Sequence, residues 1–285
     1  MSKPVKTAIV LAVAAAAVIA VIAAIMSGQS RETDYKKALD LYKDGDLDGA
    51  YAIFCNLDGY EDSAEYAEKI FIETKIEQVR FADVGDIITF GRYEQDNNLS
   101  NGPEEIEWLI LERRGESVLV LSVYALDSMV FDSPGGSNSW TDSSVRRWLN
   151  RSFLLFAFDG PEQKRIEETQ LYENGVPYEE PDTIFLLSVE EVNRYFKENA
   201  DRTCEATDYA AACGAHTDES KVYDKYGHTV EAPPRCHWWL RSPGKTEGTV
   251  VSIYSNGMIN SDVNMIDDAY RAVRPAMWID LSAGE

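Results

Sequence analysis

The stretch over residues 237–280 places the strongest constraint on the fold. It opens with an aromatic, arginine-bearing segment at residues 238–244 (WWLRSPG) and closes with a second one at residues 273–276 (VRPA). Between them lie short apolar runs joined at Asn256-Gly257, a dipeptide that provides the positive φ angles of a tight hairpin. We therefore expect several short strands here, held in place by buried tryptophan and arginine side chains.

A polar loop at residues 261–268 separates this hairpin from the last expected strand. Its amides and carboxylates can hold sugar hydroxyls or coordinate calcium through oxygen, although a solvated turn is the alternative. Adjacent tryptophans point to opposite faces of an extended strand, so the second one is included as a ligand contact. The predicted ligand-binding residues are Trp239, Asn256, Asn260, Asp262, Asn264, Asp267 and Asp268. We predict no cofactor, because the chain lacks the D-x-D-x-D-G loop of common calcium sites. Calcium bound by the oxygens of this polar loop is the alternative.

Residues 7–26 carry no charge and are almost wholly apolar, which is long enough for a helix to span a bilayer. Lys3 and Lys6 precede them and predict a cytoplasmic tail at residues 1–6, with the rest of the chain exported. The sequence therefore predicts a single-pass protein of the cell membrane with an extracytoplasmic C-terminal domain. A cleaved signal peptide is the alternative.

The formal net charge of −22 excludes nucleic acid as a partner, because such a surface repels a phosphate backbone. Four cysteines are too few for a disulfide framework in a chain of 285 residues. Export permits one pair among the last three, and Cys204–Cys213, Cys213–Cys236 and free buried thiols are all open.

Residues 31–78 have the apolar spacing of amphipathic helices, as at Tyr35, Ala38, Leu39 and Tyr42. This segment resembles a tetratricopeptide-like unit, but it covers little more than one repeat, so we interpret it as a helical stalk. From residue 83 the period changes to that of strands, and the apolar run at residues 117–123 predicts a central, buried strand. Early strands, a helical middle and late strands indicate an α+β domain over residues 83–285.

Several segments recur in one order along this domain. They are residues 85–93, the hairpin at 108–122, residues 140–150 (WT…SVRRWLN), 185–188 (FLLS), 239–244 and 273–276. Together they resemble a family of uncharacterised bacterial surface domains, catalogued as a domain of unknown function. That family is similar to the C-type-lectin-like fold of formylglycine-generating enzymes and of the variable proteins of diversity-generating retroelements. The resemblance covers residues 83–281 and implies a compact domain whose first and last strands pair.

The chemistry of those enzymes is not carried over, because they need a reactive cysteine pair near the C-terminal sheet and no cysteine follows Cys236. A zinc site built on Cys213-x-x-His216, with His228 and Cys236-His237, matches no common zinc spacing. We therefore predict a binding protein without catalytic activity, whose ligand is an envelope protein or a glycan. One alternative is a metal- or thiol-dependent enzyme centred on Cys204, Cys213, His216 and Cys236. Another is an envelope-assembly protein that acts through the helical stalk.

Overall fold

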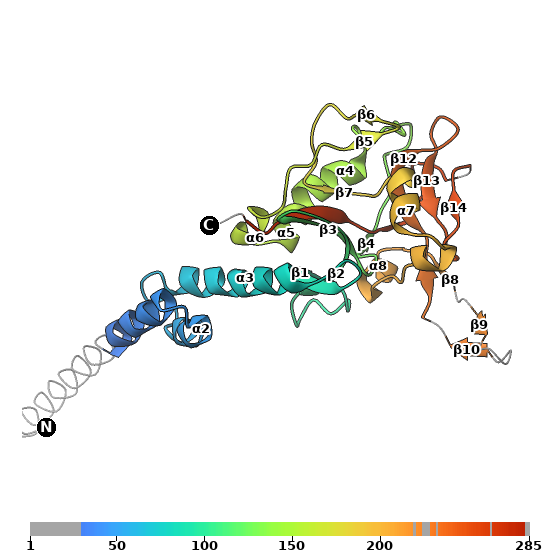
Figure 1. Cartoon of the computed structure of the whole chain (residues 1–285). Helices are drawn as coiled ribbons and strands as arrows, with labels where there is room; N and C mark the ends of the chain where they lie inside the picture. Colours follow the sequence, from blue (N-terminus) through green and yellow to red (C-terminus); the bar gives the residue numbers. More distant parts are fainter. Residues whose placement is uncertain (1–29, 219–220, 224–228, 232, 263, 283–285) are drawn as a thin grey trace, which may run out of the picture. The chain divides into compact units, whose positions relative to one another are not determined.

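The computed structural model of the protein describes residues 30–218, 221–223, 229–231, 233–262 and 264–282 (Figure 1). The chain forms two compact units, Met1–Thr74 and Lys75–Glu285. The boundary between the units lies inside one helix, α3 (Ser63–Phe81). This boundary falls a few residues before residue 78, the predicted end of the helical stalk.

The described part of the first unit is helical. One helix ends at residue 43, and α2 (Leu47–Asn56) follows after a turn. Asp46 caps α2 by accepting a hydrogen bond from the backbone N–H of Gly49. The helices enclose a small core of buried apolar residues: Ala38, Ala50, Phe54, Leu57 and Ile70. The helices therefore occur where the apolar spacing of residues 31–78 indicated them.

The second unit is α+β, and its first sheet has the strand order β1-β2-β3-β16-β7. Its strands are β1 (Ile87–Tyr93), β2 (Glu104–Arg114), β3 (Ser117–Ser122), β7 (Ile184–Phe185) and β16 (Ala276–Asp280). β3 is buried from Val118 to Ser122 and lies between β2 and β16, as its apolar run predicted. Figure 1 shows β16, in dark red, beside β3.

The prediction that the first and last strands pair is wrong. β1 and β16 share the sheet, but β2 and β3 lie between them. The physical reason is that the most apolar strand, β3, uses both of its edges, one for β2 and one for β16. β1 is therefore left at the outer edge of β2, and β16 turns its other edge to β7.

The second sheet has the order β14-β13-β12-β15-β4, and all of its strands except β4 come from residues 238–273. Its strands are β4 (Asp127–Ser128), β12 (Trp238–Pro243), β13 (Val250–Ile253), β14 (Ile259–Asn260) and β15 (Ala272–Val273). The expected hairpin joins β13 to β14, and Gly257 has a φ of +80°. Among these turn residues only Gly257 has a positive φ, as in a three-residue loop that ends in a glycine bulge.

Short helices and two-stranded ribbons fill the remaining described chain. The helices are α4 (Ser144–Trp148), a π-helical turn (Leu149–Phe153), α5 (Leu154–Ala157), α6 (Gly160–Gln163), α7 (Val189–Tyr195), a 3-10 turn (Asn199–Arg202) and α8 (Asp208–Ala212). The ribbons pair β5 (Tyr172–Glu173) with β6 (Val176–Pro177), β8 (Thr217–Asp218) with β11 (Arg235–Cys236), and β9 (Lys221–Tyr223) with β10 (Thr229–Glu231).

The predicted transmembrane helix at residues 7–26 lies outside the described residues. In the part of the chain that is described, no helix has the length and apolar character needed to cross a bilayer. The described residues therefore give no support to the predicted single-pass protein of the cell membrane with an extracytoplasmic C-terminal domain.

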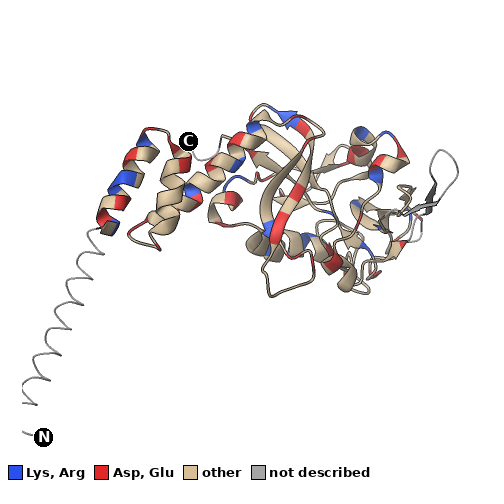
Figure 2. Ribbon diagram, turned by 90° about the horizontal axis from the view of Figure 1, so that it is seen from below, with Lys and Arg blue, Asp and Glu red and all other residues tan. Residues whose placement is uncertain are grey.

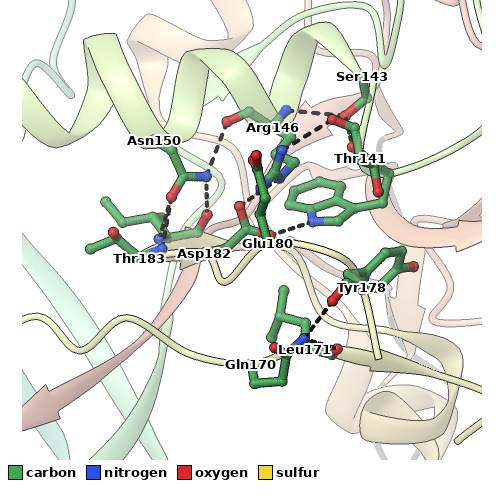
Figure 3. A network of polar contacts seen from close by, with 12 residues as sticks. Thr141, Ser143, Arg146, Asn150, Gln170, Leu171, Tyr178, Glu180, Asp182 and Thr183 are labelled. Carbon is green, nitrogen blue, oxygen red and sulfur yellow. Dashed lines mark hydrogen bonds and ion pairs between the residues drawn. The ribbon is translucent and has the colours of Figure 1, made fainter. Parts of the chain in front are cut away.

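A buried carboxylate joins the helical middle of the second unit to the first sheet (Figure 3). Asp182 is 2% exposed and accepts hydrogen bonds from Trp140 Nε1 at 2.7 Å and from Arg146 Nε at 2.6 Å. Asn150 binds the adjoining backbone, accepting from Thr183 N at 2.8 Å. These contacts explain why residues 140–150 combine a tryptophan, an arginine and an asparagine, because each one holds the segment that leads into β7.

We expect Asp182→Ala to lower the free energy of unfolding by about 3 kcal/mol, because it leaves the largely buried guanidinium of Arg146 without its main partner. The matched control is Glu180→Ala, since Glu180 also pairs with Arg146, at 3.6 Å, but its side chain is 73% exposed. That variant should lose less than about 0.5 kcal/mol. Equal losses in urea unfolding of the two variants would show that Asp182 is not the organising partner.

Candidate functional site

The structure places Trp239, predicted as a ligand contact, in the core. Trp239 is 0% exposed, and its Nε1 donates to the backbone oxygen of Met129 at 2.9 Å. Its ring meets Phe131 edge to face at 5.9 Å. The prediction for Trp239 is therefore corrected, because β12 is covered on both of its faces and leaves this ring no surface for a ligand.

Asn264 is also part of the scaffold. It is fully buried and donates to the backbone oxygens of Val250 at 3.1 Å and Asn260 at 2.9 Å. Its side-chain oxygen accepts from Arg271 Nη2 at 2.8 Å. This side chain satisfies backbone groups that the loop would otherwise bury unpaired, which corrects its prediction as a ligand contact.

The other predicted residues do not converge on one point. Asn260 bonds to Tyr254, Asp262 pairs with Lys245 at 2.7 Å, and Asp268 pairs with Arg271 at 3.6 Å. Asn256 accepts from the backbone of its own turn, and Asp267 is exposed. The described residues of this loop include no group of three that could hold a metal ion.

A pocket of about 340 Å³ lies elsewhere in the second unit, against the first sheet and α7. Its lining comes from segments far apart in sequence: Arg114, Leu119, residues 169–172, Ser188, Glu190, Glu191, Arg194, Tyr195, Arg241 and Trp278. Gln170, on one wall, donates from Nε2 to the backbone oxygen of Tyr178 at 2.8 Å (Figure 3). Tyr172, also in the lining, is 49% exposed.

The base of this pocket is built on Arg241, which is 1% exposed. Its guanidinium binds both carboxylate oxygens of Glu191, at 2.5 and 2.9 Å. It also donates to the backbone oxygens of Leu186 at 2.7 Å and Tyr172 at 3.2 Å. Glu191 in turn completes a capping box with Ser188 at the start of α7, as the sequence predicted.

A second carboxylate, Glu112, fixes two arginines that line the pocket. It accepts from Arg114 Nη2 at 3.0 Å, pairs with Arg194 at 3.3 Å and accepts from Tyr195 Oη at 2.5 Å. Burial raises the pKa of Glu112, but the hydrogen bonds from Tyr195 and Arg114 outweigh it, so this pKa lies below its ordinary value. The guanidinium of Arg114 also stacks on Trp278 at 4.3 Å from the ring centre.

The cysteines form neither of the disulfides that the sequence left open, and free thiols were the third possibility. All four are free; Cys213 is exposed, whereas Cys204 and Cys236 are buried and lie side by side, with Cys236 N donating to Cys204 O at 2.8 Å. Burial raises the pKa of Cys204, but the Cys236 thiol and the Arg274 guanidinium outweigh it and lower that pKa. Both of the predicted Cys213 disulfides are therefore corrected, since neither is formed.

The structure brings two histidines together around a residue that the sequence analysis missed. His216 Nε2 lies 3.0 Å from one oxygen of Asp218, and His237 Nε2 lies 2.9 Å from the other. Hydrogen bonds from Ser255 and His237 lower the pKa of Asp218 to about 2, and burial lowers the pKa of His237. His228, the third histidine, lies outside the described residues. The one local signal for this cluster was the alternation His216-x-Asp218, which puts both side chains on one face of a strand.

The fold and pocket together define an α+β domain with two five-stranded sheets and a polar, arginine-lined cavity. A family model described as a domain of unknown function (DUF6273) matches residues 115–281. This match covers more than half of the chain, so the protein belongs to that family. Comparison with curated proteins and with solved structures gave no significant match. The predicted membership of an uncharacterised domain family is thus confirmed.

We expect Asn264→Ala to lower the free energy of unfolding by about 2 kcal/mol, because two backbone oxygens and Arg271 lose a buried partner. Asp267→Ala, in the same loop but exposed, should change it by less than about 0.5 kcal/mol. Chemical unfolding of both variants measures the difference. A neutral Asn264→Ala would return this residue to the set of ligand contacts.

Proposed function

We propose that the domain binds a neutral carbohydrate in the pocket lined by Arg114, Tyr172, Arg194 and Trp278, without changing it chemically. The observation that carries the proposal is a half-exposed tyrosine ring beside polar groups that are already fixed in position. Sugars present both apolar C–H faces and hydroxyl groups. A site of this kind, mostly concave with a few oriented polar groups, suits such a ligand.

The balance of charge favours a neutral ligand over an anion. Arg241 is neutralised by its two hydrogen bonds to Glu191. Arg114 and Arg194 share Glu112, and Glu190 adds a further carboxylate to the pocket lining. The surface of the protein as a whole is acidic, with a net charge of −22 spread over helices, strands and loops of the described chain (Figure 2). An anionic ligand would have to approach against that field.

The pocket lining supports binding without chemistry. It includes no histidine or cysteine among the described residues. Its serine, Ser188, uses its hydroxyl to accept from Glu191 N at 3.1 Å, so that hydroxyl serves the helix cap. The carboxylate of Glu191 in the lining is bound through both oxygens by Arg241, and Glu112, next to the lining residues Arg114 and Arg194, is bound by those arginines, so neither carboxylate is free to act on a ligand.

The resemblance to lectin-like domains does not carry this proposal, because β1 and β16 are not neighbours. The arginines of residues 238–244 and 273–276 have structural roles. In each segment the arginine is buried and donates to backbone oxygens: Arg241 to Leu186, and Arg274 to Ser122 at 2.9 Å. The proposal rests on the pocket alone.

A glycan array probed with the full chain tests the proposal, followed by titration of the best saccharide. Tyr172→Ala and Arg194→Ala should each weaken binding about tenfold, because each removes a side chain that lines the pocket and would contact the saccharide. Tyr270→Ala is the matched control, as Tyr270 is 59% exposed and lies outside the pocket lining, and it should bind as the wild type does. No bound saccharide, or equal loss in all three variants, would contradict the proposal.

A further inference from the structure

His216, Asp218 and His237 converge because of the way two short strands pair. β8 and β11 are antiparallel, with Thr217 opposite Cys236 and Asp218 opposite Arg235. The same register carried one residue further brings His216 opposite His237, and the two ring centres are 5.5 Å apart. His216 directly precedes β8 and Asp218 lies two residues further along the same extended segment, so their side chains share a face. The ribbon therefore presents all three side chains on one side.

The three side chains offer ligand atoms to a common point. Each Asp218 oxygen faces a different histidine nitrogen, at 3.0 Å for His216 and 2.9 Å for His237. All three potential ligand atoms lie within 4.8 Å of one another. Ligands of a tetrahedral zinc ion are about 3.3 Å apart, given bond lengths of about 2.0–2.1 Å, so small side-chain rotations suffice to close the site.

A neighbouring hydroxyl orients the carboxylate. Ser255 Oγ donates to Asp218 Oδ2 at 2.6 Å from the turn that follows β13. The ring of Tyr254 packs against His237 at 4.7 Å between centres. Groups of this kind, which bond or pack against the ligands, hold metal-binding side chains in position. The Asp218 carboxylate and the His237 imidazole are therefore held before any ion arrives.

Stability of the fold does not account for this arrangement. The side chains of His216 and Asp218 are 55% and 46% exposed, and hydrogen-bonded pairs at such exposure contribute little to stability. The chain has only three histidines in 285 residues, yet two of them meet at one carboxylate. A second group of side chains among the described residues could also hold an ion, and it consists of Glu94, Asp96 and Glu104. These carboxylates accept hydrogen bonds from the backbone of their own loop, which accounts for their positions without a metal.

We propose that His216, Asp218 and His237 bind one divalent transition-metal ion, with Zn²⁺ the best match. Two imidazole nitrogens and one carboxylate oxygen suit zinc and its neighbours, whereas Ca²⁺ and Mg²⁺ prefer all-oxygen sites. Three protein ligands leave at least one coordination position of the metal open. Because the side chain of His216 is exposed, water can reach that open position. This site differs from the Cys213-x-x-His216 arrangement considered from the sequence, since it uses His216 without any cysteine.

The test is metal analysis of the full chain after incubation with Zn²⁺ and dialysis. The wild type should retain one zinc per chain, and His216→Ala and Asp218→Asn should each lose at least tenfold in affinity. Saturating Zn²⁺ should raise the Tm of the wild type by about 5 °C or more, while Mg²⁺ should not. Cys213→Ser is the matched control and should retain zinc as the wild type does, because Cys213 lies outside the ligand group.

Unfolding curves recorded without metal keep the test interpretable, because His216 and Asp218 are exposed enough for their variants to fold. Substitution by Co²⁺ should give a visible spectrum without a thiolate charge-transfer band. Absence of retained zinc in the wild type would overturn the proposal. So would loss of zinc in Cys213→Ser with retention in His216→Ala, or a thiolate band in the cobalt spectrum.

Discussion

The second unit depends on one buried ion pair, that between Arg241 and Glu191. A guanidinium that is 1% exposed is tolerated only where its charge and its N–H groups find partners. Here the partners come from α7 and from the backbone at Leu186 and Tyr172. Because Arg241 lies on β12 of the second sheet, and Leu186 directly follows β7 of the first, this one side chain ties the two sheets together.

The same contacts shape the pocket. Arg241 and Glu191 form part of its lining, and the bond to Tyr172 O fixes the backbone that carries the exposed ring. The contacts that join the two sheets therefore also form the proposed binding site, and they order its polar groups before a ligand binds. The proposed metal site, by contrast, lies on a separate two-stranded ribbon, so the two proposals stand or fall independently.

Local features could be predicted from the sequence, and long-range pairings could not. The central position of β3 follows from its apolar run, and the capping box of α7 follows from Ser188 and Glu191. Which strand pairs with the last strand depends on competition among several strands for the same edge, and a local sequence pattern does not indicate the outcome of that competition. The burial of Asn264 was missed for a similar reason, since its hydrogen-bond partners lie on other segments. The metal cluster needed the β8–β11 register to become visible.

A double-mutant cycle on Arg241→Met and Glu191→Gln tests the central role of the ion pair most directly. Glutamine can still accept the cap hydrogen bond from Ser188 N, so the change removes the charge while sparing the helix start. We predict that each single substitution lowers the free energy of unfolding by about 3 kcal/mol. The double substitution should cost less than the sum of the two by about 2 kcal/mol. Losses that add to within about 0.5 kcal/mol would contradict the account.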